Sequence, residues 1–258
     1  MNTPLEEIGA IAEKISREAS AIPMAHFRAA LDIDAKADDS PVTVADRKTE
    51  AYIRDALQSA FPDHGIFGEE YGISGSLDGE TWIIDPIDGT RSFITGSPLF
   101  GMLLGFLAEG RPKLGLVRMP ALDETFVGLA GSGATLNGAA IHCRQTRTLS
   151  EAMIYLNEGE RLAGMNPELF GRLCRSGHTR RMAYDCYPHA LVAAGQIDAV
   201  VDCGLEPYDY LPLVGLIEAA GGVITDWQGR DLTLDSDGKV VTAATPELLQ
   251  EMLELING

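Results

Sequence analysis

The amino-acid sequence predicts a mixed α/β protein of the α+β type, in which helices flank sheets. Apolar residues with helical spacing mark the beginning and the end of the chain. Between residue 62 and about residue 140, short apolar runs are cut by glycine and proline, as in hairpins and meanders. From about residue 187 helical and strand-like segments alternate. The 258 residues suffice for one large domain or two small ones with a substantial shared core.

Two helices are expected before residue 61. Thr3 to Glu6 has the form of a capping box with Pro4 at the first helical position, and apolar residues then follow helical spacing as far as Ile22. We therefore expect a long opening helix that Pro23 interrupts or kinks. A polar turn leads into a second helix, from about Ala45 to Ala60. The predicted apolar face of this second helix contains Tyr52, Ile53, Ala56 and Leu57.

The later elements follow from the same patterns. Strands are expected at 81–86 and within 101–120 and 124–138. The second half then predicts, in order, a helix near 187–195, a strand at 197–202, a helix around 210–220, a strand at 221–227 and a closing helix from about Pro246. We place the boundary between two subdomains near 140–150 and divide the chain into 1–145 and 146–258.

Composition and charge exclude several classes of protein. The net charge of −18 repels phosphate backbones, so we expect no nucleic-acid partner. No apolar stretch approaches the length of a membrane span, and the first residues lack the pattern of a signal peptide, which predicts a cytoplasmic protein. The four cysteines form no CxxC pair and are expected to be reduced and buried. Residues 32–40 (DIDAKADDS) lack the glycine and the glutamate of an EF-hand loop.

Two carboxylates stand at the end of the apolar run WIIDPIDGT. Pro86 favours an extended backbone at Asp85, and Gly89 permits a close turn after Asp88. If a helix begins there, the amides of Gly89 and Thr90 form an anion site. A single Asp-x-x-Asp is weak evidence, because turns are rich in aspartate for local reasons.

Further acidic residues occupy similar positions. Glu69 and Glu70 follow another short apolar run, Asp46 stands at the start of a helix, and Asp209 lies at a helix N-terminus with Pro212 still in the first turn. Each has a local explanation, as a loop charge or a residue that suits the helix dipole. If they converge on one cleft, however, they repel each other unless cations neutralise them. Magnesium suits such oxygen ligands, and a pair of ions can activate water against a phosphate ester.

These stretches together resemble the signatures of the inositol monophosphatase-like phosphatase superfamily. Glu69-Glu70, DPIDGT at 85–90 and YDYLPLVGLIEAAGG at 208–222 match three signatures, and SPVTVAD at 40–46 matches a fourth, in the same order along the chain. The resemblance implies a layered αβαβα sandwich that hydrolyses a small phosphorylated metabolite with Mg²⁺, two to three ions per site, or with Mn²⁺ as a substitute. Some members of the superfamily are homodimers, and the sequence leaves the oligomeric state open.

The resemblance also implies which residues hold the ions. Glu69, Asp85 and the carbonyl of Ile87 would hold the first metal. Asp85 would bridge to the second, which Asp88 and Asp209 complete.

It further implies catalytic roles. Glu70 would hold a third, more weakly bound ion or its waters. Thr90, oriented by Asp46, would position the attacking water, and the amides of Gly89 and Thr90 would grip the phosphate.

Two stretches bear on the substrate. Residues 85–101 and 185–209 look more like the histidinol-phosphate phosphatase branch than the inositol branch. Histidinol phosphate carries an ammonium group, which the carboxylate of Asp185 would pair with. Asp202 and Asp88 are expected as further substrate contacts, although Asp202 is shorter than the glutamate usual in both branches. Tyr184 stands where the histidinol branch tends to have glycine, so it either narrows the pocket or stacks on an imidazole. A structural helix cap is the alternative for Asp185.

Two other functions stay open at this point. One is hydrolysis of inositol 1-phosphate or another small phosphomonoester. The other, from a different class, is a catalytically silent relative that binds a metabolite or a protein. All the acidic positions and Thr90 are intact, which argues against loss of activity.

Overall fold

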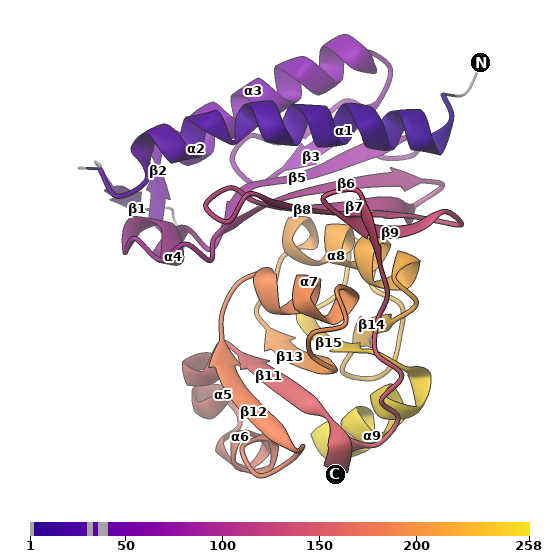
Figure 1. The fold of residues 1–258 in the computed structure, drawn as a ribbon. Helices are drawn as coiled ribbons and strands as arrows, with labels where there is room; N and C mark the ends of the chain where they lie inside the picture. The colour runs from indigo at the N-terminus through magenta and orange to yellow at the C-terminus, as the bar shows by residue number, and fades with distance from the viewer. Residues whose placement is uncertain (1–2, 30–32, 36–40) are drawn as a thin grey trace.

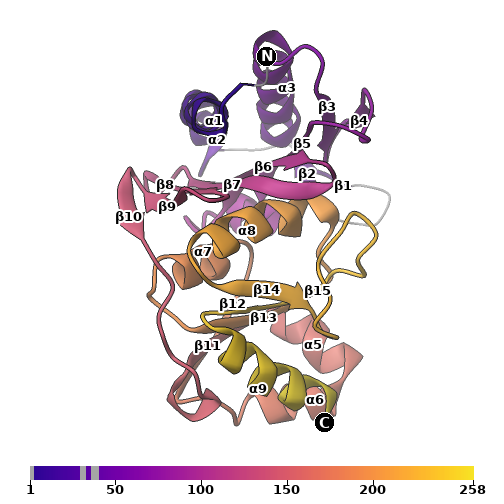
Figure 2. The same ribbon diagram turned by 90° about the vertical axis from the view of Figure 1, so that its right-hand side faces the viewer.

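The computed structural model describes residues 3–29, 33–35 and 41–258, with the backbone alone at 33–35, 41 and 42. Five layers are stacked on one another: helices, a large sheet, helices, a smaller sheet, and helices again (Figures 1 and 2). This arrangement is the expected αβαβα sandwich. Most of the segment rejected as an EF-hand, and Ser40 of the SPVTVAD match, lie outside the described residues.

The first layer contains α1 (Leu5–Ala19), α2 (Ala21–His26) and α3 (Val44–Ala60). The break at Ser20 lies three residues before Pro23, because a proline ring clashes with the carbonyl four residues upstream and cannot donate to it. The predicted capping box is wrong. Helix α1 begins at Leu5, so Pro4, which has no polar side chain, occupies the N-cap and no side-chain cap bond forms.

The predicted apolar face of α3 is wrong at one residue, Tyr52. Ile53 and Leu57 are fully buried, but Tyr52 is 37% exposed. Its hydroxyl donates to Glu18 Oε2 on α1 at 3.0 Å, so the polar end of the ring stays near water.

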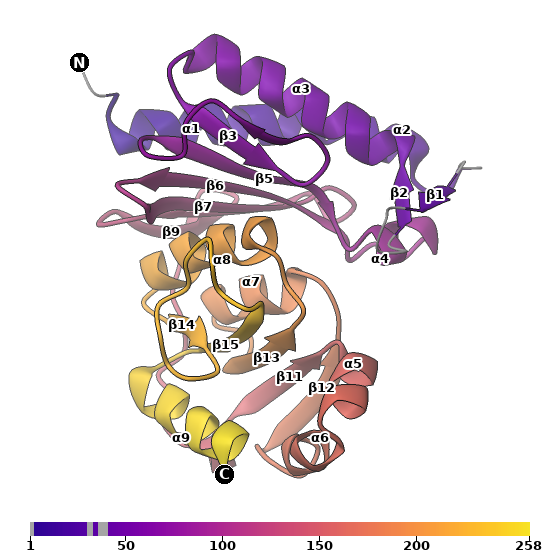
Figure 3. The same cartoon turned by 180° about the vertical axis from the view of Figure 1, so that it is seen from behind.

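The large sheet has the strand order β10-β9-β8-β7-β6-β5-β3-β4. Only the β3–β5 pair is parallel among the described strands of this sheet. Its strands are β3 (Gly65–Gly68), β4 (Gly72–Ser74), β5 (Thr81–Asp88), β6 (Gly101–Ala108), β7 (Arg111–Met119), β8 (Glu124–Leu129), β9 (Gly133–Leu136) and β10 (Ala139–Ile141). A separate pair, β1 (Ile33–Ala35) and β2 (Pro41–Thr43), and the short helix α4 (Thr90–Ile94) lie at one end of it (Figure 3).

The smaller sheet has the order β12-β11-β13-β15-β14. Its strands are β11 (Met153–Asn157), β12 (Thr179–Ala183), β13 (Ala199–Cys203), β14 (Val223–Asp226) and β15 (Lys239–Ala243). Helices α7 (Tyr187–Ala193) and α8 (Pro207–Ala219) lie between the two sheets. The outer face is covered by α5 (Gly159–Met165), α6 (Pro167–Leu173) and α9 (Pro246–Asn257), and a 3₁₀ turn spans Leu149–Glu151 (Figure 2).

Helix α8 is the centre of the sandwich. Every residue from Tyr210 to Ile217 is buried, because a helix between two sheets has no solvent-facing side. Glycines allow it to lie directly on the large sheet: a Cβ at Gly115 would fall 1.9 Å from the carbonyl oxygen of Pro212. The helix begins three residues earlier than predicted, so Pro212 lies in its second turn and not in its first.

The strands of the two sheets are separate along the chain. The large sheet ends at Ile141 and the smaller sheet begins at Met153. The division at 145 and 146 stays a prediction, since α8 from the second half packs on the first sheet. All four cysteines are free thiols, three of them buried and Cys174 partly so. No helix in the described ranges combines the length and apolar character needed to cross a bilayer.

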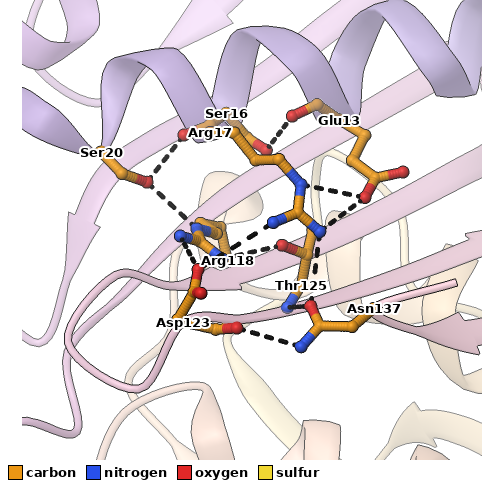
Figure 4. Close-up of polar contacts among 8 residues, drawn as sticks. All are labelled: Glu13, Ser16, Arg17, Ser20, Arg118, Asp123, Thr125 and Asn137. Carbon is orange, nitrogen blue, oxygen red and sulfur yellow. Dashed lines mark hydrogen bonds and ion pairs between the residues drawn. The ribbon is translucent and has the colours of Figure 1, made fainter.

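A buried arginine connects α1 to the hairpin of β7 and β8 (Figure 4). Arg118 is 6% exposed and donates to three oxygens: Ser20 Oγ at 3.1 Å, Thr125 Oγ1 at 3.0 Å and Asp123 Oδ1 at 2.7 Å. Asn137 extends the network by accepting from the Thr125 amide at 2.9 Å and donating to the Asp123 carbonyl at 3.0 Å. Each of the three nitrogen atoms of the guanidinium group therefore donates a hydrogen bond, which compensates for the burial of its charge.

We predict that Arg118→Ala lowers the free energy of unfolding by about 2–3 kcal/mol, because it leaves buried hydroxyls without their charged donor. Chemical denaturation measures the loss. The matched control is Arg17→Ala in the same network, which removes an arginine that is 40% exposed and is expected to cost less than about 1 kcal/mol. Equal losses for the two variants would contradict a special role for the buried guanidinium.

Candidate functional site

Strand β5 delivers two carboxylates to the same cavity by means of a bulge. In a regular strand, residues three apart point to opposite faces of the sheet. Here Asp85 pairs with Leu103 and Asp88 with Gly101, so three steps along β5 correspond to two along β6. The extra residue re-aims the strand. Asp85 Oδ1 accepts the amide of Ile87 at 2.9 Å, which fixes the turn locally.

Two other elements bring acidic residues beside them. Glu69 follows β3, which pairs in parallel with β5, so it emerges next to Asp85. Asp209 lies in the first turn of α8, where its Oδ2 accepts the amide of Glu206 at 2.8 Å in a capping box. One carboxylate oxygen each from Asp85, Asp88 and Asp209 lies within 4.8 Å of the others. The three aspartates expected around the second metal therefore converge.

The electrostatics of this group favour a bound cation. Burial, then Glu69 and the other two aspartates, raises the pKa of Asp85 well above its usual value. Burial and then the neighbouring Asp209 raise the pKa of Asp88 to about 7, although the Cys186 amide opposes the shift. Burial, with a contribution from Glu69, raises the pKa of Asp209 to about 7. An all-oxygen donor set that resists ionisation by itself fits a hard divalent cation.

A hydroxyl and a helix start lie next to these carboxylates. Gly89 has φ of 82° and caps α4, which begins at Thr90. Thr90 Oγ1 lies 3.2 Å from Asp46 Oδ1 and 3.2 Å from the carbonyl of Ile87. Asp46 is fully buried behind it, and its other oxygen accepts from the amide and the hydroxyl of Thr43 at 2.8 and 2.5 Å. The predicted Thr90–Asp46 pair is therefore in contact.

A cavity of about 230 Å³ joins these groups. It is lined by nine of the predicted site residues: Glu69, Asp85, Ile87, Asp88, Gly89, Thr90, Asp185, Asp202 and Asp209. The two other predicted residues stand behind this lining. Asp46 contacts Thr90, and the amide of Glu70 donates to Glu50 at 2.6 Å.

Asp185 also lines the cavity, next to Gly89 and Asp88. It has φ of 63°, and its carboxyl group lies so close to Gly89 that a Cβ there would fall 2.5 Å from the carboxyl carbon. Ser92 Oγ donates to Asp185 Oδ2 at 2.6 Å. The N-cap of α7 is Cys186 with no side-chain cap bond, so the helix-cap alternative for Asp185 is wrong. Burial, then Asp88, raises the pKa of Asp185 to about 8.

Asp202 lines the cavity but is engaged on its inner side. It is 1% exposed. Its Oδ2 accepts from Asn157 Nδ2 at 2.6 Å and lies 3.1 Å from His189 Nε2, and its Oδ1 accepts the Cys203 amide at 2.8 Å. His189 is buried, as expected for a packed histidine. The short side chain of Asp202 thus forms part of a buried network in the wall.

Sequence reasoning missed several residues of this wall. Arg91, Glu158 and Arg161 also line the cavity. They carry no motif: Arg91 lies on α4 and the two others at the start of α5, and only the tertiary fold brings them to one cavity. Tyr184 lines a neighbouring pocket and not the cavity itself, and its hydroxyl donates to Glu160 Oε1 at 3.0 Å.

Comparison with known proteins agrees with this architecture. The sequence model of the inositol monophosphatase family matches residues 4–257 of this chain. A histidinol-phosphatase of Chlorobaculum parvum is 37% identical over 89% of this chain and 90% of its own, and the bifunctional phosphatase IMPL2 of Arabidopsis thaliana is 36% identical over 98% and 76%. The solved structure of an inositol monophosphatase from Zymomonas mobilis covers both chains completely, with 35% identity and a TM-score of 0.89.

The chain therefore belongs to the inositol monophosphatase family. With the phosphatases among its relatives, it is a phosphomonoesterase, as the sequence predicted. These relatives differ in their named substrates, so family membership alone leaves the ester unspecified.

We predict that Asp88→Asn stabilises the metal-free protein at pH 8 by at least about 1.4 kcal/mol, the equivalent of one pKa unit. The folded-state pKa of about 7 lies above the ordinary value of 3.8. The neutral carboxyl group therefore favours folding below pH 4, and this contribution is lost as the pH rises through 7. Thermal unfolding in a chelator measures it. The gain should shrink by pH 5, and a gain independent of pH would contradict the electrostatic origin.

Proposed function

We propose that this protein is a Mg²⁺-dependent histidinol-phosphate phosphatase, which converts L-histidinol phosphate and water to histidinol and phosphate in histidine biosynthesis. The observation that carries the substrate assignment is the partly buried carboxyl group of Asp185, which lines the cavity beside Gly89 and Asp88. The similarity to a histidinol-phosphatase over most of both chains supports it.

The acidic cluster would hold the ions. Glu69, Asp85 and the carbonyl of Ile87 would form the first set of ligands, and Asp85, Asp88 and Asp209 would form the second. When bound, Mg²⁺ supplies positive charge for the phosphate oxygens and makes water a better nucleophile. Asp85 and Asp88 lie on the buried strand β5 and Asp209 in the first turn of α8, so little reorganisation of these three is needed on binding.

The remaining residues act on water and on the phosphate. A hydrogen bond from the Thr90 hydroxyl to Asp46 would leave the hydroxyl oxygen as an acceptor that orients the attacking water. Asp46 is fixed in turn by Thr43. The amides of Gly89 and Thr90, at the start of α4, would bind the phosphate oxygens. Glu70 would hold a further ion or its waters.

The substrate end of the cavity favours a cation. The protonated amine of histidinol phosphate would pair with Asp185 and allow its carboxyl group to ionise. The ring hydroxyls of inositol phosphate are neutral and would leave the Asp185 carboxyl group without a charged partner. Glu158 adds a second carboxyl group to the lining, where Arg91 and Arg161 lie near enough to offset its charge. The choice between esters would then depend on electrostatic pairing and not on the metal centre.

A panel of substrates tests the assignment. Phosphate release is measured with histidinol phosphate, inositol 1-phosphate and fructose 1,6-bisphosphate, with and without Mg²⁺. We expect turnover only with Mg²⁺ and the highest kcat/KM for histidinol phosphate. Asp88→Asn, which removes a ligand, is the inactive control. No turnover on any ester would favour a catalytically silent relative.

Inositol 1-phosphate is the second candidate. The likeness to the inositol monophosphatase from Zymomonas mobilis, over both complete chains, favours it. A higher kcat/KM for inositol 1-phosphate in the same panel would replace the first assignment with this one.

We predict that Asp185→Asn raises KM for histidinol phosphate by about tenfold or more, since a charge-assisted hydrogen bond contributes about 1.5–3 kcal/mol. The KM for inositol 1-phosphate should change much less. Asp63→Asn, at an exposed turn, is the matched control and should leave both constants unchanged. Equal increases in KM for the two esters would indicate a structural role for Asp185.

A further inference from the structure

The loop that carries Glu69 and Glu70 is attached to α3 by a buried glutamate outside the catalytic cavity. The side chain of Glu50 is fully buried. Its Oε2 accepts the amide of Glu70 at 2.6 Å, and its Oε1 accepts the amide of Tyr71 at 3.2 Å. Burying a carboxylate costs free energy unless its oxygens accept hydrogen bonds. These two bonds therefore stabilise Glu50 in its buried position.

Arg54, one helical turn further along α3, completes the contact. Its Nε donates to Glu50 Oε1 at 2.7 Å. The other two nitrogens donate to the loop itself, Nη2 to the carbonyl of Gly72 and Nη1 to Ser74 Oγ at 3.1 Å. The Glu50–Arg54 clamp, as we call this pair, therefore binds the loop at four points between Glu70 and Ser74.

The clamp fixes the backbone on one side of Glu69, and the sheet fixes it on the other. The amide of Glu69 donates to the carbonyl of Ile84 at 3.1 Å, beside Asp85. The next amide, that of Glu70, is held by Glu50. Gly68 is part of the same arrangement, because a Cβ there would fall 2.1 Å from Glu50 Oε1. Only glycine allows this approach.

We propose that the Glu50–Arg54 clamp is a positioning device that sets the affinity for the divalent cation by holding Glu69 and Glu70 in place. The inference rests on the proposed role of these two glutamates as cation ligands. Groups that orient metal ligands typically change metal affinity by about 10–100-fold when they are removed.

Glu50→Gln tests the clamp with Mn²⁺ alone as the probe. The glutamine side chain keeps the size but puts an NH₂ group against the amide of Glu70 or against Arg54. Binding is followed by electron paramagnetic resonance of free Mn²⁺ in the substrate-free protein. We expect the Kd to rise by about tenfold or more. At saturating Mn²⁺, kcat and KM should return to the wild-type values, since Glu50 touches no reacting group.

Gly68→Ala provides an independent route to the same contact. The added methyl group displaces the Glu50 carboxylate without changing any charge, so the Kd for Mn²⁺ should rise as well. The double variant should bind no more weakly than the weaker single variant, because both remove one interaction. Glu13→Gln is the matched control: it breaks a Glu–Arg pair of the same i, i+4 spacing, 2.9 Å apart, on the exposed side of α1.

The outcomes separate this inference from the proposed function. Wild-type affinity in both Glu50→Gln and Gly68→Ala would overturn the role of the clamp and leave the phosphatase assignment intact. A wild-type protein that binds no Mn²⁺ would overturn the metal site itself. If Glu50→Gln fails to fold, Gly68→Ala and Arg54→Lys test the clamp in the same titration. Arg54→Lys keeps the charge but loses the forked contact with Gly72 and Ser74. We expect it to raise the Kd for Mn²⁺ by a smaller factor.

Discussion

The mutual repulsion of buried carboxylates is the constraint on which the rest of this structure depends. Asp85 and Asp88 are buried and Asp209 is partly buried, one carboxylate oxygen of each lies within 4.8 Å of the others, and Glu69 lies beside them. A flexible chain would relieve such repulsion by moving the charges apart. Here a buried strand, a bulge and the first turn of a buried helix prevent that, so the repulsion persists, and a bound cation would relieve it.

Helix α8 shows how the sandwich keeps these groups in place. It is apolar on all sides and lies against the large sheet with no side chain at Gly115 or Gly128 to separate them. Asp209 at its start serves both purposes: one oxygen caps the helix while the carboxylate faces the cluster. Stability of the helix start and geometry of the site therefore depend on the same residue.

The two halves of the chain contribute different residues to the cavity. The large sheet and its loops provide all the predicted metal ligands except Asp209. Asp185 and Asp202 come from the second half, beside α7 and at β13, and are tied together by Asn157, whose Nδ2 donates both to Asp202 and to the carbonyl of Asp185. Because this part of the cavity wall is built separately from the acidic cluster, members of one family can act on different esters.

The sequence by itself determined the mixed α/β class, the acidic residues and the family, and the resemblance to that family implied the layer order. Those signals are local: apolar periodicity, turn residues, and carboxylates that follow buried runs. The tertiary structure decided three things that no local pattern contains. It added Arg91, Glu158 and Arg161 to the cavity, it engaged Asp202 in a buried network, and it bound Glu50 to the loop of Glu69. Each depends on contacts between residues that are far apart in the chain. Packing of the elements determines which residues meet, and no sequence spacing indicates such contacts.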